Sequence, residues 1–237
     1  MTKKEQKETE VVEEVKTEEA QPALEFPKVL LIVAMESERD KIVKPALEKL
    51  GLLGRTDIWV ATTGVGKVSA TLSTTLALLS ANSADPSRLK ELICVNVGVC
   101  GGNKEAAEGF PCVQINKVCN NDFDTSAVDG DAFEKQVITL TSEVENMRTC
   151  FSQDHFCTDP AELPSDGEPY YVDMELFGIA SACAQLGIRL TSLKSVCDVI
   201  GGEQKEQYEG INFDVACARC AQLLEKYLST SSDVVLT

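Results

Sequence analysis

Residues 171–198 read Tyr-Val-Asp-Met-Glu-Leu-Phe-Gly-Ile-Ala-Ser-Ala-Cys-Ala-Gln-Leu-Gly-Ile-Arg-Leu-Thr-Ser-Leu-Lys-Ser-Val-Cys-Asp, and this stretch predicts a helix followed by a strand. Apolar side chains recur with helical spacing from Met174 to Leu186, and the small residues among them would let the helix lie close to a sheet. Gly187 is typical of a helix C-terminus, because glycine accepts a left-handed conformation. The apolar run 188–196 then predicts a strand, and Asp198 follows it.

Three acidic residues stand at the ends of these two predicted elements. Asp173 and Glu175 lie at the start of the helix, and Asp198 lies at the carboxyl end of the strand. In α/β sheets ligands bind at that edge, so the three acids are candidate site residues. The alternative is structural, with Asp173 as an N-cap, Glu175 as a partner of the helix dipole and Asp198 as a turn residue. This stretch alone leaves both interpretations open.

The same alternation of strand and helix extends through the rest of the chain. Apolar runs predict strands at 29–34, 58–63, 92–97, 112–118 and 136–140, and helical patterns predict helices at 35–50, at 64–79 and at 213–228. Residues 98–102 are glycine-rich and predict a turn. This order predicts a single α/β domain with a central mixed sheet flanked by helices.

Length and charge limit the classes of function. The chain has 237 residues, which predicts one domain, and its formal net charge is −16. Such a charge argues against binding to nucleic acid or to an anionic membrane surface. Residues 1–27 are charge-dense and predict a disordered acidic tail, and residues 231–237 predict a frayed end, which leaves 28–230 as the folded domain.

Cysteine and histidine usage predicts a reducing, cytoplasmic protein without a metal or another cofactor. The chain has ten cysteines, most of them within apolar runs, as buried thiols are. It has one histidine, His155, and the Cys217–Cys220 spacing falls inside a helical pattern without a second ligand pair. Gly-Val-Gly-Lys at 64–67 lacks the spacing of a P-loop and the third glycine of a dinucleotide site.

Six short motifs occur in order, and together they carry a resemblance to a known family. They are Ala-Met-Glu-Ser-Glu (34–38), Thr-Gly-Val-Gly-Lys-Val-Ser-Ala (63–70), Asn-Val-Gly-Val-Cys-Gly-Gly (96–102), Ser-Gln-Asp-His-Phe (152–156), Val-Asp-Met-Glu (172–175) and Ser-Val-Cys-Asp (195–198). The chain resembles the nucleoside phosphorylase superfamily over residues 28–228. Within it, the motifs are most similar to those of 5′-methylthioadenosine/S-adenosylhomocysteine nucleosidases.

The resemblance implies an enzyme that cleaves the N-glycosidic bond of a 5′-modified adenosine. It implies that Asp198 is the general acid on the purine and that Glu38 activates the attacking water. Lys194 matches a basic position of the family and would support the site electrostatically. The remaining implied site residues hold or border the sugar and the base: Glu175, Met174, Phe156, Cys157, Gly101, Val99 and Cys197.

Two positions depart from the family, and the acceptor is open to argument. Val99 stands where these nucleosidases often carry a small hydroxyl residue, and Cys197 replaces a common serine. Related phosphorylases grip phosphate with arginines at the positions that hold Glu38 and Asn96 here. An acid repels phosphate, so the residue types favour hydrolysis. The alternatives are a phosphorylase or hydrolase acting on another purine nucleoside, and a binding or storage protein without catalysis.

The resemblance also implies a homodimer. Residues 120–128 form a polar loop with one large apolar residue, Phe123. In the resembling nucleosidases this region crosses a two-fold interface and covers the neighbour's 5′ pocket. Phe123 or Val128 is therefore expected to line the partner's site, and a solvated surface loop is the alternative.

Overall fold

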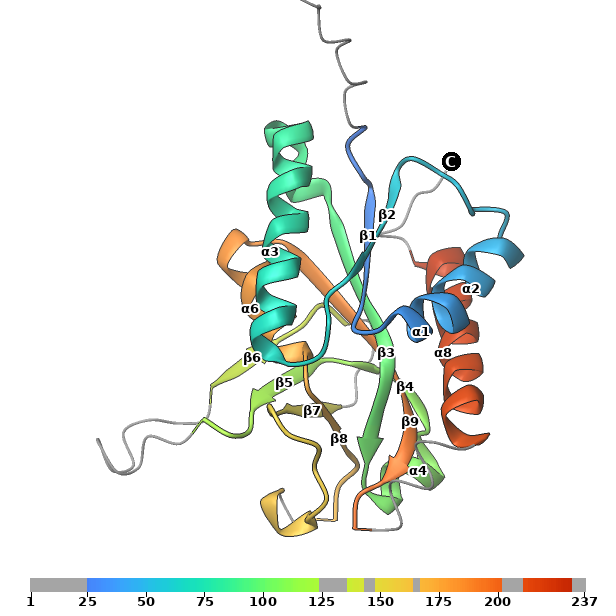
Figure 1. The fold of residues 1–237 in the computed structure, drawn as a ribbon, viewed down its shortest axis with the longest axis vertical. Helices are drawn as coiled ribbons and strands as arrows, with labels where there is room; N and C mark the ends of the chain where they lie inside the picture. The colour runs from blue at the N-terminus through green and yellow to red at the C-terminus, as the bar shows by residue number, and fades with distance from the viewer. Residues whose placement is uncertain (1–24, 124–135, 143–147, 164–166, 202–210, 232–237) are drawn as a thin grey trace, which may run out of the picture.

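A mixed sheet forms the centre of the molecule. The computed structural model describes residues 25–123, 136–142, 148–163, 167–201 and 211–231, and in these ranges nine strands form one sheet. Its main path runs β2-β1-β3-β8-β7-β5-β6, with β9 paired to β3 and β4 paired to β9 (Figure 1). The bounds are β1 Val29–Val33, β2 Ile58–Thr62, β3 Ile93–Gly102, β4 Cys112–Ile115, β5 Lys117–Asn120, β6 Val137–Thr139, β7 Thr149–Ser152, β8 Tyr170–Asp173 and β9 Arg189–Val199.

Strand β3 lies at the junction of the sheet. It runs parallel to β1 and to β9 and antiparallel to β8, so it touches three other strands. Its first eight residues are all buried, as expected for a strand covered on both faces. The two halves of the sheet therefore meet along β3.

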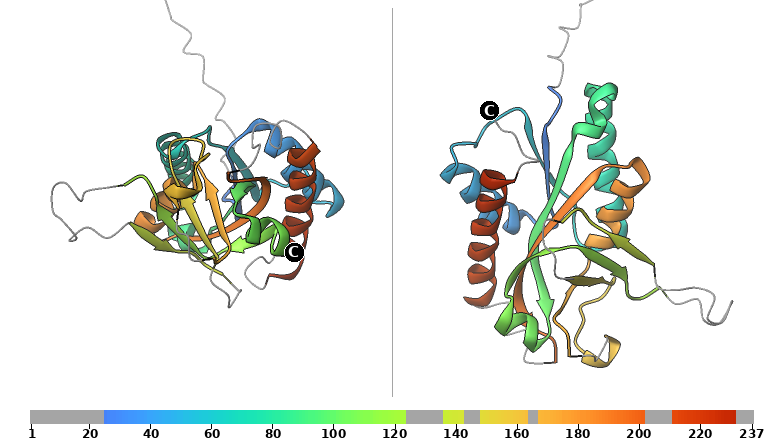
Figure 2. Two further views of the ribbon diagram at one scale, coloured as in Figure 1. Left: turned by 90° about the horizontal axis from the view of Figure 1, so that it is seen from below. Right: turned by 180° about the vertical axis from the view of Figure 1, so that it is seen from behind.

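Helices cover both faces of the sheet (Figures 1 and 2). Helices α3 and α6 pack together on one face, and α2 and α8 lie on the other. The bounds are α1 Glu36–Glu38, α2 Lys44–Lys49, α3 Lys67–Ala84, α4 Lys104–Gly109, α6 Leu176–Leu186 and α8 Ile211–Thr230, with a π-helical turn over Arg39–Val43. None of the helices in the described ranges is long and apolar enough to cross a membrane.

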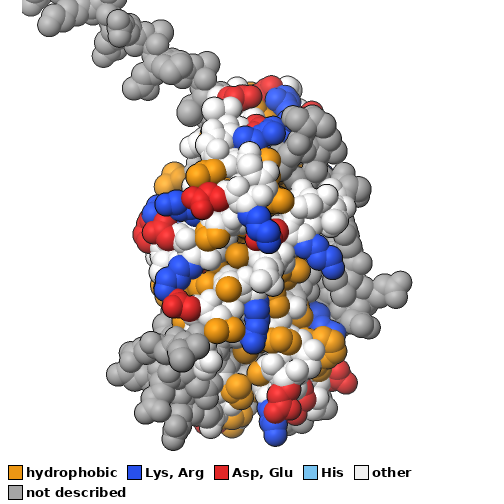
Figure 3. Space-filling model, turned by 90° about the vertical axis from the view of Figure 1, so that its right-hand side faces the viewer, with side chains coloured by type: hydrophobic (Ala, Val, Ile, Leu, Met, Phe, Trp, Pro, Cys, Tyr) orange, Lys and Arg blue, Asp and Glu red, His pale blue; other side chains and the backbone are white. Residues whose placement is uncertain are grey.

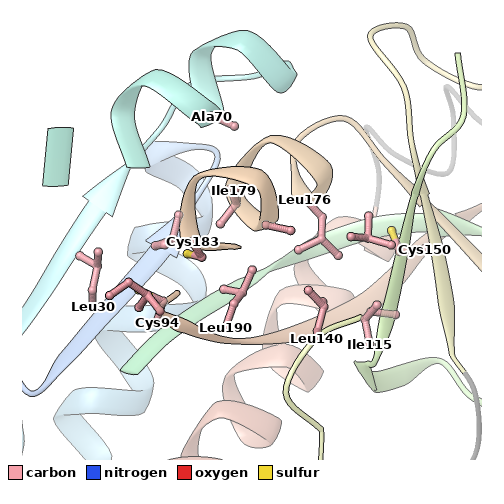
Figure 4. Close-up of a cluster of buried hydrophobic side chains, with 14 of the residues drawn as sticks. Leu30, Ala70, Cys94, Ile115, Leu140, Cys150, Leu176, Ile179, Cys183 and Leu190 are labelled. Atoms are coloured by element: carbon pink, nitrogen blue, oxygen red, sulfur yellow. The ribbon is translucent and has the colours of Figure 1, made fainter. Parts of the chain in front are cut away.

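Two apolar clusters hold these layers together. The first joins α3 and α6 to the sheet and includes Leu30, Cys94 and Leu190 of the strands with Ile179 of α6 (Figure 4). The second joins α2 and α8 to the opposite face of β1, β3 and β9. Each fully buried leucine or isoleucine contributes about 1.5–3 kcal/mol relative to exposure. All ten cysteines are free thiols.

Helix α6 shows why the central stretch is rich in small residues. Gly178 faces the start of α3, where an added Cβ would clash with the backbone carbonyl of Lys67. The helix ends at Gly187, whose φ of 61° is left-handed, as the sequence predicts. The close contact of α6 with α3 therefore depends on a glycine.

Five segments differ from the sequence-based expectation. Residues 112–118 form two strands, because the chain breaks at Asn116, where β4 pairs with β9 and β5 turns to β7. Residues Tyr170–Asp173 form strand β8, just before the predicted helix, and the sequence predicts no strand there. The residues of 98–102 continue β3 instead of forming a turn. Strand β7 is additional, and α3 extends five residues beyond Leu79, to Ala84.

The ends of the described chain add two details. Phe26, within the predicted tail, is buried in the first apolar cluster, so the fold begins before Lys28. Residues 1–24 and 232–237 lie outside the described ranges. Lys, Arg, Asp and Glu side chains are interspersed over the face shown in Figure 3.

Candidate active site

Glu38 is held against β3 by backbone N–H groups. The N–H groups of Ala34 and Met35 donate to its Oε2, at N–O distances of 3.1 and 3.0 Å. The N–H of Val99 donates to its Oε1 at 2.9 Å. The side chain is 2% exposed, and burial raises the pKa of its carboxyl group, although Lys194 and the three N–H donors oppose that rise. A carboxyl group with a raised pKa is closer to the pH at which a general base works.

Asp198 lies near the carboxyl end of β9, beside β3, the strand against which Glu38 is held. It stands opposite Gly101, and an added Cβ on Gly101 would lie 3.1 Å from its Oδ2. The register between β3 and β9 shifts here, because Cys100 faces Val196 and Gly101 faces Asp198, which leaves Cys197 as the extra residue of a bulge. The bulge sets the place of the acid on the strand.

The surroundings of Asp198 favour a protonated carboxyl group. Burial raises its pKa above the ordinary value, and the thiol of Cys197, which donates to Oδ1 at 3.0 Å, offsets this in part. Oδ2 is the oxygen that faces Gly101. Such a group can deliver a proton to a base bound next to β3.

Glu175 is the third buried acid of the site. The N–H of Gly66, just before α3, donates to its Oε1 at 3.0 Å. Burial, followed by the negative charge of Asp173, raises the pKa of Glu175 to about 7. Glu38 also contributes to this rise, so the two carboxyl groups influence each other.

Asp173 has a structural role that differs from an open acid at the sheet edge. Its Oδ2 forms an ion pair with Nζ of Lys194 at 2.8 Å and accepts the N–H of Leu176 at 3.0 Å. The hydroxyl of Ser152 donates to its Oδ1 at 2.5 Å. Asp173 therefore supports the first turn of α6 from the end of β8, although the N-cap of that helix is Glu175 and not Asp173.

Lys194 is the cation of the site and lies within the sheet. Its side chain is 3% exposed, and burial alone would lower its pKa. The charges of Asp173, Glu175 and Glu38 outweigh burial and raise the pKa, so the ammonium group stays charged. One buried cation therefore stands among three buried acids.

The predicted base-binding residues lie on a loop after β7. Phe156 is 46% exposed, whereas Cys157 is buried. Glu162 stabilises this loop through its Oε2, which lies 2.7 Å from Nε2 of His155 and accepts a hydrogen bond from Nε2 of Gln153 at 3.2 Å. A partly exposed aromatic ring is the kind of surface on which the ring of a ligand can stack.

The structure brings most of the predicted site residues together around β3. Val99, Gly101 and Cys197 contact the two carboxyl groups directly. Met174 is half-buried, and its N–H donates to Glu175.

The sequence analysis did not assign a role to Gly66 or Gly98, although both lie in glycine motifs that it singled out. Phe123 is half-buried, and Val128 lies outside the described residues. No group of three or more potential metal ligands occurs among the residues described.

Comparison with known proteins places this arrangement in context. The family model described as the phosphorylase superfamily matches residues 29–230. The 5′-methylthioadenosine/S-adenosylhomocysteine nucleosidase of Bacillus subtilis is 25% identical over 243 residues, covering 88% of this chain and 96% of that protein. The Helicobacter pylori enzyme of the same name has a TM-score of 0.68 at 19% identity, covering 87% of this chain and 100% of the other. The futalosine hydrolase of Helicobacter pylori has a TM-score of 0.67 at 19% identity, covering 87% and 99%. These structures confirm the predicted fold class.

Proposed function

This chain belongs to the phosphorylase superfamily, and from that premise we propose that it is a nucleosidase that hydrolyses the N-glycosidic bond of a 5′-modified adenosine. The observation that carries the proposal is the placement of two buried carboxyl groups along β3. Glu38 accepts the N–H of Val99, and Asp198 packs against Gly101. One group is positioned to accept a proton and the other to donate one.

In the proposed reaction Asp198 protonates the leaving base. As the bond between the sugar C1′ and the purine nitrogen breaks, its electron pair moves to the purine, and the proton of Asp198 passes to N7. Water adds to C1′ and gives a proton to Glu38, so the products are free adenine and a reducing sugar. The adenine anion is a poor leaving group. A positioned proton donor lowers the barrier to its departure and raises the rate by about 10²–10⁴-fold.

The state of Glu38 supports water as the acceptor. Its carboxylate already occupies three backbone N–H groups, which are the donors that an anion would otherwise use. A phosphate dianion beside this carboxylate would be repelled, whereas a water molecule gains a hydrogen-bond acceptor. Asn96 offers no charge to offset that repulsion, because its side chain is a neutral amide, and that amide is already hydrogen-bonded to Ile32 and Ser192.

The other predicted residues are assigned to binding. We assign Glu175 to the ribose hydroxyls, with Met174 packing on the sugar. Phe156 would stack on the base, and the backbone of Cys157 would read the edge of the adenine. Val99, Gly101 and Cys197 border the site through their contacts with the two carboxyl groups. The 5′ substituent is the part of the substrate that these contacts do not specify.

Product analysis tests the proposal. We expect 5′-methylthioadenosine and S-adenosylhomocysteine to yield free adenine and a reducing sugar at a rate independent of phosphate. Because one structurally similar protein is a futalosine hydrolase, the panel should include futalosine, with adenosine and inosine for comparison. A sugar 1-phosphate, or a rate proportional to phosphate concentration, would contradict hydrolysis. Binding without release of any base would favour a storage protein.

We further propose that the active form is a homodimer that uses the outer face of α3. Val68, Leu72, Leu76 and Leu79 lie along this face and are between 48% and 78% exposed. From Val68 to Ala84 the helix has no charged residue, although 25% of the chain is charged. The face in Figure 3, by contrast, carries charges of both signs. An exposed, uncharged, apolar helix face is typical of an interface.

A second copy of the chain is the partner that fits this face. Each copy has a formal net charge of −16, so two copies approach at least cost through a surface without charges. The start of α3 is also joined to the loop that carries Phe123, because Lys67 donates to Asn120 at 2.6 Å and pairs with Asp122. A two-fold contact along α3 would therefore bring that loop close to the partner.

Charge insertion on α3 tests the dimer. Leu72→Glu combined with Leu76→Glu is expected to convert a dimer into a monomer in sedimentation equilibrium. The two introduced carboxylates would be buried in the interface, close to the same carboxylates of the partner. Leu53→Glu is the matched control, since Leu53 is 53% exposed but lies outside α3. A wild-type monomer that is fully active would contradict the proposal, as would a double variant that remains dimeric.

A further inference from the structure

We propose that Gly98 is a positioning residue for Glu38 and that Oε1 of Glu38 is the atom that receives the attacking water. This inference rests on the proposed function, because it assigns a role within the same hydrolysis. Gly98 lies in β3, immediately before Val99, whose N–H binds Glu38. The carboxylate therefore lies across the backbone of two consecutive residues of one strand.

The space at Gly98 is already occupied by the carboxylate. An added Cβ would lie 2.6 Å from Oε1, 3.3 Å from Cδ and 3.6 Å from Oε2 of Glu38. A contact below 3.0 Å is one that real Cβ atoms essentially never make, so the carboxylate would have to move. Gly98 is not among the glycines with positive φ, so glycine is required here by contact and not by backbone conformation.

Glu38 has little freedom to move away. Its Oε2 is bonded to the N–H groups of Ala34 and Met35, and its Oε1 to the N–H of Val99. A shift that relieves a clash at Gly98 would stretch the bond to Val99 and leave a buried N–H without its acceptor. Such a group costs free energy, so the methyl group would disturb both position and stability.

The bonding pattern also identifies the oxygen that remains open. A carboxylate oxygen accepts about two hydrogen bonds, one for each lone pair. Oε2 already accepts two, whereas Oε1 accepts one from the described residues. Oε1 is also the oxygen nearest to Gly98, which has no side chain to cover it. Water is therefore expected to bind Oε1, and Gly98 leaves the space that this atom occupies beside β3.

The first test is kinetic. Gly98→Ala is expected to lower kcat for release of adenine by about 10²-fold, because the base is displaced, with KM changed less than threefold. Gly109→Ala is the matched control, since an added Cβ at Gly109 meets nothing within 4 Å. A wild-type kcat in Gly98→Ala would overturn the proposal. A raised KM with an unchanged kcat would assign Gly98 to binding instead.

The second test measures the contact without using activity. Gly98→Ala is expected to lower Tm in the wild-type background and to change it little when combined with Glu38→Ala, because the clashing carboxylate is then absent. Equal losses of Tm in both backgrounds would overturn the proposal, as would a double variant that fails to fold. If the wild-type protein releases no base from any nucleoside, the proposed function fails, while this cycle still reports whether Gly98 positions Glu38.

Discussion

Asp198→Asn is expected to lower kcat by about 10²–10⁴-fold while KM changes little, as measured by steady-state release of adenine. The amide has nearly the shape of the acid and keeps an oxygen for the thiol of Cys197, so the pocket is preserved. It has no acidic proton to transfer to the purine. The loss therefore falls on the chemical step, in which the base leaves, and not on substrate binding.

The pH dependence of the same variant gives an independent measurement. Burial raises the pKa of Asp198, so the protonated form persists to a higher pH than for an ordinary aspartate. Activity that depends on this proton is expected to fall as pH rises through the raised pKa, and this limb of the profile should be absent in Asp198→Asn. Substantial turnover in the variant would remove Asp198 from the role of general acid.

The stability of the variant separates chemistry from folding. A carboxyl group with a raised folded-state pKa favours folding at low pH, and this contribution is lost as pH rises from the unfolded to the folded pKa. Above the raised pKa the buried charge of Asp198 is thus unfavourable, and in that pH range Asp198→Asn is expected to have a Tm equal to or above that of the wild type. Asp40→Asn, at an exposed position, is the control with unchanged kcat.

Continuous apolar runs made most of the fold predictable. Residues 29–33 and 58–62 form strands as expected. Strand β1 is buried throughout, which is why its run of apolar residues is uninterrupted, whereas β2 lies at the edge of the sheet and is only partly buried. Strands β7 and β8 have four residues each and contain polar residues such as Ser152 and Asp173. These polar groups are satisfied by partners far along the chain, so local sequence gives no sign that they belong to a sheet.

Glycines were the main source of error within the sheet. Residues 98–102 contain three glycines and are typical of a turn when taken alone. In the structure they continue β3, since β9 and β8 pair with them and the carboxylates of Glu38 and Asp198 fill the space beside Gly98 and Gly101. The requirement for glycine arises from residues about 60 to 100 positions away, and short-range patterns do not contain it.

The motifs identified the acids of the site, but their environments depend on the fold. Asp173 and Asp198 are both candidate site acids in the sequence, Asp173 at the start of the predicted helix and Asp198 at the carboxyl end of the predicted strand. The structure separates them, because Asp173 meets the ammonium group of Lys194, whereas Asp198 has the thiol of Cys197 beside it. That difference depends on which strands are neighbours and on the bulge at Cys197.

Glu38→Gln is expected to lower kcat by orders of magnitude, because an amide cannot accept the proton of the attacking water at neutral pH. The carboxylate has both oxygens bonded to N–H groups, and the amide can present an oxygen to only one side. An oxygen kept toward Ala34 and Met35 leaves the NH₂ group facing the N–H of Val99. This mismatch costs about 1–3 kcal/mol, and removal of a desolvated charge offsets part of it. Thermal unfolding measured beside kcat separates the two effects.

The matched control and the double variant decide between a positioned base and a general disturbance. Glu36→Gln changes an exposed acid in the same helix, α1, and is expected to leave kcat unchanged. Combined with Asp198→Asn, Glu38→Gln is expected to cost far less than the product of the two single effects, because acid and base act on one reaction step. Multiplicative losses would contradict a shared step. An unchanged rate in Glu38→Gln would mean that another group activates the water, or that the acceptor is not water.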